Sequence, residues 1–346
     1  MTILPSMFKG ASLLAVFAFF VAAVTACGGG HSPAATPAAP VAADNAPTSA
    51  SNDVRLATAK RYVAALPSGA VDALYTPEAT QSFAGLKDVS GASVIARRYK
   101  RLLEPFADLK IAASRIWISG DHAAVEWAAV GIHKRAWMGF PAKKGAVGFP
   151  ALTILTIGED GRISQDHTYV DLVTVLTQIG AGPPGAKARA APVLASTPEV
   201  IVAKGGAEEN AGVQLSKAMS AALDHGDEAA YLALVTDDIS HGNAAVAEPA
   251  VGIEKERDHF RRTGAAFKDL NQKVEGWGAQ DFALVEWTSS GKNVGPIGPF
   301  PAVNKNLTWH GAQVVQVRGG KVAKMSVYFD RVELYSQIGA MKALVE

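Results

Sequence analysis

The sequence predicts an α+β protein of two tandem domains, each with N-terminal helices packed on a curved antiparallel sheet, because two separate segments occur twice. Residues 169–180 and 328–339 are identical at six of twelve positions, and residues 121–127 and 281–287 at five of seven. The copies lie 330 − 171 = 159 and 281 − 121 = 160 residues apart. A nearly constant register over separate blocks indicates a duplicated domain, since this period is far longer than that of a solenoid repeat.

The composition is that of a globular protein. The 346 residues are 49% hydrophobic and 19% charged, with a formal net charge of +1. Proteins that bind nucleic acid through its phosphates usually carry a marked basic excess. We therefore expect no nucleic-acid partner.

Residues 1–26 have the pattern of a secretory signal peptide. Lys9 precedes a fourteen-residue apolar run at positions 11–24, which is shorter than the roughly 20 residues of a membrane span. Residues 24–27 resemble a bacterial lipobox, although Val24 stands where Leu is commoner. Cys27 is the only cysteine, and in this pattern it would be lipidated and become the mature N-terminus. The alternative is an ordinary signal peptide followed by an incidental cysteine.

Residues 27–52 are expected to form the lipidated cysteine and a disordered tether. Small residues and proline dominate this stretch, so it cannot bury enough apolar surface to offset the entropy of ordering. Gly28, rather than Asp, follows Cys27, which by analogy with lipoprotein sorting favours the outer membrane. We expect a protein of the cell envelope that faces the periplasm and contacts the membrane through its lipid anchor.

Residues 53–180 are expected to form the first domain, residues 181–210 an Ala/Pro-rich linker and residues 211–346 the second domain. Helical spacing predicts helices at 54–66, 70–75, 91–106, 215–224, 228–236 and 253–266. Strand-like runs follow in each half, at 109–118, 123–132, 152–157 and 163–170, and at 272–276, 282–289, 307–317 and 322–329. Helices followed by a meander predict the α+β class.

Several short motifs resemble those of SnoaL-like domains, which belong to the nuclear-transport-factor-2-like superfamily. In the first domain they are residues 131–133, 140–141, 160–163 and 171–180; in the second they are residues 300–301, 320–322 and 330–339. The second domain departs from the pattern by carrying Asn293 where the first has His133. The resemblance implies a cone-shaped barrel with a deep apolar pocket that takes a small apolar carbonyl compound, without a cofactor.

In the polyketide cyclases of this family the terminal aspartate acts as a general acid and base. Carried over by motif, the candidate catalytic residues are Asp171 and Asp330. An aldol cyclisation requires a proton to be removed next to a carbonyl and one to be delivered to the new alkoxide. Desolvation in an apolar pocket raises the pKa of a carboxyl group and suits it to both steps.

Side chains near these aspartates are candidate substrate-binding groups. Strand alternation places His167, Tyr169 and Asp171 on one face, and Tyr328 shares a face with Asp330 in the second copy. A tyrosine hydroxyl there could stabilise an enolate. His133 and His167 could assist in the first domain only.

Structural roles remain open for all these residues. An aspartate directly before an amphipathic helix is a favoured N-cap, and the tyrosines could be core or pocket wall. The repeated Glu126 and Glu286 could be pocket carboxylates, but we favour exposed strand positions; Trp127 and Trp287 are expected in the core. The eight histidines form no closely spaced ligand pair, so no metal site is expected.

Three functions are compatible with these features. The protein is an enzyme of cyclase (including ester cyclase), isomerase or hydrolase type, a non-catalytic binder of a lipid or other small molecule, or a protein-interaction module of the envelope. Residues 152–157 carry apolar side chains of both parities, as in a sheet covered on both faces. We therefore expect the two domains to pack together as an internal pseudo-dimer.

Overall fold

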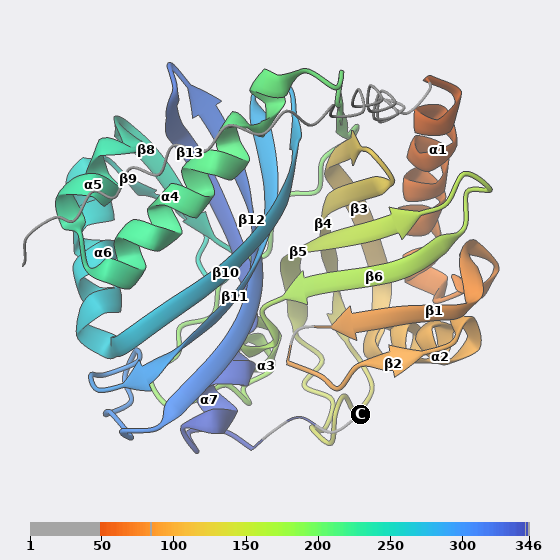
Figure 1. Ribbon diagram of the computed structural model, residues 1–346. Coiled ribbons are helices and arrows are strands. Elements are labelled where there is room, and N and C mark those ends of the chain that lie inside the picture. Colours follow the sequence, from red (N-terminus) through yellow and green to blue (C-terminus); the bar gives the residue numbers. More distant parts are fainter. Residues whose placement is uncertain (1–48, 84, 343, 345–346) are drawn as a thin grey trace, which may run out of the picture. The chain divides into compact units, whose positions relative to one another are not determined.

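The computed structural model describes residues 49–83, 85–342 and 344 (Figure 1). The expected signal peptide, Cys27 and most of the expected tether lie outside these residues. The last part of that stretch, residues 49–52, belongs to helix α1 (Ser49–Ala65), which begins before the helix predicted at residues 54–66. Among the described residues, no helix is long and apolar enough to cross a membrane.

The first domain has its helices before most of its strands, as predicted. The elements are α1, β1 (Tyr75–Phe83), β2 (Val89–Ser90), α2 (Ala92–Leu103), β3 (Phe106–Ser119), β4 (His122–His133), β5 (Ala146–Ile157), β6 (Ile163–Val170), α3 (Leu172–Gln178) and β7 (Glu199–Val202). Their sheet has the order β2-β1-β6-β5-β4-β3-β7. Strands β3 to β6 form the antiparallel meander, whereas β1 pairs with β6 in parallel.

The second domain repeats this plan. Its elements are α4 (Ala211–His225), α5 (Glu228–Ala233), β8 (Val235–Asn243), β9 (Ala250–Val251), α6 (Ile253–Ala266), β10 (Phe267–Ala279), β11 (Phe282–Asn293), β12 (Asn306–Arg318), β13 (Lys321–Phe329) and α7 (Arg331–Gln337). The sheet order is β10-β11-β12-β13-β8-β9. Figure 1 shows α4 lying across this sheet, and α5 and α6 lying beside strands β8 and β9. The α+β prediction is confirmed for both domains.

Strands β1, β2, β8 and β9 were not predicted. The helix expected at residues 70–75 is a short 3-10 turn at Asp72–Leu74, after which β1 begins. In β1 and β8 polar side chains occupy many positions, so the segments lack a strong apolar alternation, and pairing with the final strand of each domain holds them. Strand β7 lies within the expected linker, where the β-branched residues 200–202 pair beside β3.

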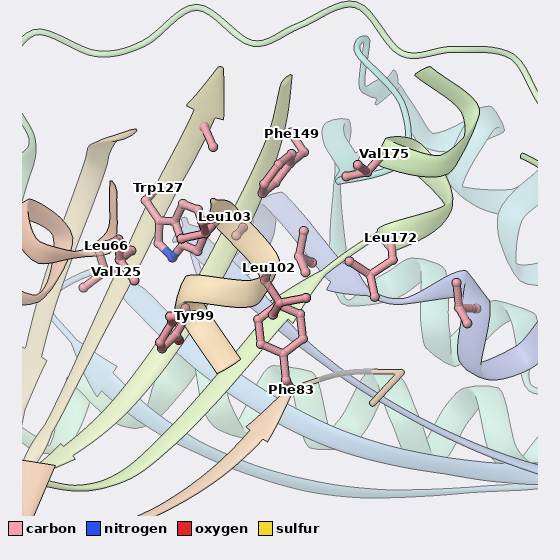
Figure 2. Packing of buried hydrophobic residues seen from close by; sticks show 14 of the residues in the cluster. Leu66, Phe83, Tyr99, Leu102, Leu103, Val125, Trp127, Phe149, Leu172 and Val175 are labelled. Carbon is pink, nitrogen blue, oxygen red and sulfur yellow. The ribbon is translucent and has the colours of Figure 1, made fainter. Parts of the chain in front are cut away.

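Along each strand of the meander, alternate side chains face two different environments. In β4, Val125, Trp127 and Ala129 are buried in the core of the first domain, where Trp127 packs edge-on against Phe149 at 6.2 Å between ring centroids (Figure 2). The expected core position of Trp127 is confirmed. Glu126 therefore points to the opposite face, and what covers that face determines its chemistry.

Candidate functional site

The final strands bring the two predicted aspartates, both tyrosines and His167 to contacts between the two domains. Asp171 is the N-cap of α3 and 2% exposed, and it accepts hydrogen bonds from the amide and hydroxyl of Thr174 at 3.1 and 2.6 Å. The same carboxylate pairs with Arg331 of the second domain, with Nη2 at 2.6 Å and the backbone nitrogen at 3.2 Å. The capping alternative is confirmed for Asp171.

Asp330 makes the reciprocal contact. It is the fully buried N-cap of α7, and its Oδ1 accepts from the amides of Val332 at 2.9 Å and of Leu172, in the first domain, at 3.1 Å. Its Oδ2 has no hydrogen-bond partner among the described residues. Burial, and then the negative charge of Asp171, raise the pKa of Asp330 well above its usual value. General acid/base roles for Asp171 and Asp330 stay predictions, and both carboxylates are engaged in capping.

A second reciprocal pair joins the sheets. Tyr328 donates to Glu126 of the first domain at 2.7 Å, and Tyr169 donates to Glu286 of the second at 2.7 Å. Glu126 is 6% exposed and Glu286 is half-buried, so the prediction that both are exposed is wrong. The reason is that the face opposite each core meets the other domain. Burial raises the pKa of Glu126, although Arg115 at 3.4 Å opposes the shift.

The two candidate histidines lie in different places. His167 joins the contact between the sheets, with Nδ1 2.8 Å from Glu286, and this hydrogen bond raises its pKa. His133 is fully buried at the end of β4, and burial lowers its pKa. Its Nδ1 accepts from the amide of Lys143 at 3.4 Å, just as the side chain of Asn293 accepts from Val303 at 2.8 Å. Both side chains therefore fix the Phe-Pro loop of their own domain.

A polar network is buried in the interior of the first domain. Asp166 is fully buried and accepts from the Tyr75 hydroxyl at 2.5 Å, the Gln81 amide at 2.9 Å and the Tyr99 hydroxyl at 2.9 Å. The hydroxyl of Tyr99 also contacts that of Tyr62 at 2.6 Å. Burial raises the pKa of Asp166 even though these hydrogen bonds favour its ionised form. Asp166 was not predicted as a site residue from the sequence, and it points inward because its parity is opposite to that of His167 and Asp171.

The second domain has a cavity of about 240 Å³. Its aromatic wall is formed by Phe267, Trp287, Trp309 and Phe329, with Phe267 and Trp309 stacked at 4.6 Å. Its polar lining consists of Ser216, Ser220, Tyr231, His241, Asn243, His259, Thr263, Gln272 and Gln313. No Lys, Arg, Asp or Glu is among the described residues that line it. Trp287, expected in the core, instead forms part of this wall.

Two histidines and a buried glutamate form the titratable part of this cavity. His241, from β8, contacts Glu256 of α6 through Nδ1 at 2.8 Å, and Tyr231 donates to the other oxygen of Glu256 at 2.7 Å. Burial alone would raise the pKa of Glu256, but the hydrogen bond and positive charge from His241 outweigh it and hold the value at about 2. Glu256 is 1% exposed and does not line the cavity, so its carboxylate contacts the imidazole of His241 from inside the protein.

His259 lies one helical turn beyond Glu256, and its ring meets that of His241 edge-on at 4.6 Å. Burial, followed by the charge of His241, lowers the pKa of His259 to about 4. His259 is therefore a neutral hydrogen-bonding group near pH 7. Among the residues that the structure describes, no group of three or more His, Cys, Asp or Glu is placed to hold a metal ion.

The sequence contained a signal for this site that comparison of the copies could have found. Gln81 and His241 occupy matching positions, since each pairs in the sheet with the residue five positions before the terminal aspartate, Asp166 or Met325. Glu256 follows Gly252 by four positions, as Ile95 follows Gly91. A histidine and a glutamate that replace Gln and Ile at core-facing positions of a duplicated domain mark the copy with different chemistry.

The profile of the SnoaL-like polyketide cyclase family matches residues 57–179 and 213–338, which together make up most of the chain. The chain belongs to this family. Each half is thus one SnoaL-like domain, with the terminal aspartate, the Phe-Pro loop and the final short helix in the predicted order. No match was found among curated proteins.

Solved structures similar to single SnoaL-like domains of this chain include three bacterial proteins. A candidate SnoaL-like polyketide cyclase from Jannaschia sp. CCS1 is 22% identical, with 40% of this chain and 99% of that chain covered and a TM-score of 0.36. TsrD from Streptomyces laurentii is 28% identical, with coverages of 37% and 94% and a TM-score of 0.34. An LEH-like epoxide hydrolase of M. tuberculosis is 19% identical, with coverages of 38% and 91% and a TM-score of 0.31.

The first prediction concerns the ion pair between the domains. Replacing Arg331 with Met leaves the buried carboxylate of Asp171 without its cation, which should lower the free energy of unfolding by about 3 kcal/mol. Urea unfolding followed by tryptophan fluorescence measures the change. Arg318→Met is the matched control, because its pair with Asp238 is exposed and its loss should leave the unfolding midpoint nearly unchanged. Equal midpoints for both variants would contradict a stabilising role for the Asp171 pair.

The second prediction concerns Asp330. Its pKa in the folded state is raised above the usual value of 3.8, so its protonated form contributes stability that is complete below that value. This contribution is lost as the pH rises through the folded pKa. Asp330→Asn keeps the capping oxygen and cannot ionise, so its stability relative to the wild type should rise as the pH is raised above about 4. A constant difference over this range would show that Asp330 does not titrate abnormally.

Proposed function

We propose that the second SnoaL-like domain binds a small uncharged carbonyl compound in its cavity and removes a proton next to the carbonyl, with His241 as general base. The observation that carries this proposal is the His241–Glu256 pair at the wall of an aromatic cavity. The cavity has the volume of about eight liquid water molecules, at roughly 30 Å³ each, so it suits a small molecule of one or two rings. The absence of ionisable side chains other than His and Tyr from the described lining favours an uncharged ligand.

The hydrogen bond to Glu256 defines which nitrogen of His241 is the base. In the neutral form of His241, the form that can act as a base, Nδ1 carries the proton in this contact because the carboxylate of Glu256 can only accept. Nε2 then has a free lone pair and can take a proton from carbon. Glu256 also stabilises the imidazolium that forms, as a carboxylate behind a histidine does in other general-base sites. Tyr231 holds the second oxygen of Glu256 and so positions the carboxylate.

His259 can stabilise the enolate formed in this step. When the carbon–hydrogen bond breaks, its electron pair moves toward the carbonyl oxygen and the proton moves to His241. A neutral imidazole at this position offers an N–H donor to the developing oxyanion. The resulting enolate is the intermediate that cyclase and isomerase reactions share, so the proposal covers both reaction classes.

The first domain, in this proposal, is a scaffold that completes an internal pseudo-dimer. The Asp166 network occupies its interior, and the cross-domain bonds of Asp171 and Asp330 support a single packed unit. A non-catalytic small-molecule binder is the second candidate function, favoured by the same cavity without any use of His241 as a base.

The third prediction tests the general base. Incubation of the full-length protein in D₂O with a panel of small cyclic ketones should show loss of α-proton signals by NMR for at least one compound. His241→Gln should slow this exchange by about 10²- to 10⁴-fold, because the group that takes the proton is removed. Glu256→Gln should slow it less, since Glu256 acts through His241.

The Asp171→Asn, Asp330→Asn double variant is the matched control, because Asn keeps both helix caps. It should exchange protons at the wild-type rate. Loss of exchange in this variant, with His241→Gln unaffected, would transfer the acid/base role to the terminal aspartates. If neither the wild type nor the double variant exchanges protons, and native mass spectrometry shows a retained ligand, the result would favour a non-catalytic binding function.

We also propose that the chain is exported and anchored to the cell envelope through a lipid on Cys27; the support is the signal-like run and the lipobox-like residues 24–27. The fourth prediction follows from this. Expressed in a bacterial host, the protein should fractionate with membranes and carry the mass of a lipidated N-terminal cysteine. Cys27→Ser should move it to the soluble fraction of the periplasm, whereas membrane association unchanged in Cys27→Ser would contradict the anchor.

A further inference from the structure

A second hollow, outside the histidine cavity, lies on the opposite face of the second domain's sheet. It measures about 230 Å³ and is lined by β8, β13, the loop after β8, Pro150 of the first domain and Arg189 of the segment that joins the domains. We call it the β13 groove. Alternation places Lys324, Ser326 and Tyr328 on this face of β13, and Ser240 pairs directly with Lys324 across the strands.

Two cations line the β13 groove without a carboxylate partner. Among the described residues, no ion pair within 4.0 Å joins Arg189 or Lys324 to an acid. The charge of Lys324 helps to oppose the rise in the pKa of Glu126 that burial causes. Glu126 already has two other partners, however: Arg115 at 3.4 Å and the Tyr328 hydroxyl at 2.7 Å. Unpaired cations that face one hollow repel each other, and a bound anion would offset this repulsion.

Arg189 is held in place from both ends. Its backbone carbonyl accepts from Gln178, the glutamine of the repeated motif, at 2.9 Å, and its Nη1 donates to the carbonyl of Ala244 at 2.6 Å. Its Nε is buried and has no partner among the described residues. Burial lowers the pKa of Arg189, although the negative charge of Asp171 opposes this shift. A fixed, partly desolvated guanidinium with a spare donor is well suited to an oxyanion.

The matching place in the first domain does not have this character. The positions of Lys324 and Ser326 are occupied there by Gln165 and His167, and His167 is paired with Glu286. The groove is therefore specific to the second domain and is not shared by the two copies. Gly242, on β8 opposite Ser326, leaves further room because it adds no side chain to the floor.

We propose that the β13 groove binds an oxyanion, a carboxylate or phosphate group of a small molecule, between Arg189 and Lys324, with the hydroxyls of Ser240 and Ser326 as additional donors. The site is separate from the histidine cavity and does not depend on the function proposed for it. An anion there would contact both the second domain and the segment that joins the two domains, and so would stabilise the position of that segment on the domain.

The fifth prediction is tested by calorimetric titration of the full-length protein, in a zwitterionic buffer of low ionic strength, with inorganic phosphate and separately with benzoate. At least one anion should bind, and Lys324→Gln should weaken binding by about tenfold, since one charge-assisted hydrogen bond is lost. Lys324 is exposed, so its replacement should not impair folding. Lys321→Gln is the matched control, because Lys321 is an exposed lysine of the same strand outside the groove.

Arg189→Gln should weaken binding of the same anion at least as much as Lys324→Gln. Binding of phosphate alone would identify a phosphate ester as the ligand class, and binding of benzoate alone a carboxylic acid. Absence of binding by both anions, or binding that Lys324→Gln and Arg189→Gln leave at the wild-type affinity, would overturn the proposal.

Discussion

The reciprocal capping of two short helices by the aspartates of both domains is the interaction on which the rest of this structure depends. Asp330 accepts the amide of Leu172 at the start of α3, and Asp171 accepts the amide of Arg331 at the start of α7. The first amides of a helix have no partner within the helix, so each domain supplies an acceptor that the other needs. Helices α3 and α7 have seven residues each and would be only marginally stable alone, so these hydrogen bonds also stabilise the helices themselves.

This contact fixes what each face of the final strand can do. At the end of each final strand, the residues with the parity of Asp171 and Asp330 contact the other domain, and the tyrosine–glutamate pairs continue that contact along the sheets. Only the opposite parity remains for the interior of each domain. There the first copy has Asp166 and the second has Met325, and this difference separates a filled polar network from an aromatic cavity. In our proposal, the second domain therefore carries the chemistry.

The sequence predicted the duplication, the fold class and the shared face of the final strand, because all three follow from local periodicity and internal repetition. It did not predict β1 or β8, since their polar side chains do not alternate strongly and tertiary pairing holds them. It also assigned the wrong environment to Glu126. Parity states which residues share a face, but only the packing of a second domain shows that the face of Glu126 is buried. His241 and Glu256, 15 residues apart on a strand and a helix, meet only through the tertiary fold.

The first domain can hold a carboxylate in its interior because hydrogen bonds satisfy both oxygens of Asp166. Asp166 has partners on four side chains, so its burial leaves no oxygen unpaired, and such a network stabilises a unique arrangement of the surrounding strands. In the second domain the corresponding space holds apolar rings and Met325 instead, and the nearby carboxylate of Glu256 is hydrogen-bonded to His241 and Tyr231. The uncharged front of the cavity is then free for a ligand. In our proposal, the first copy therefore contributes stability and the second copy contributes the ligand chemistry.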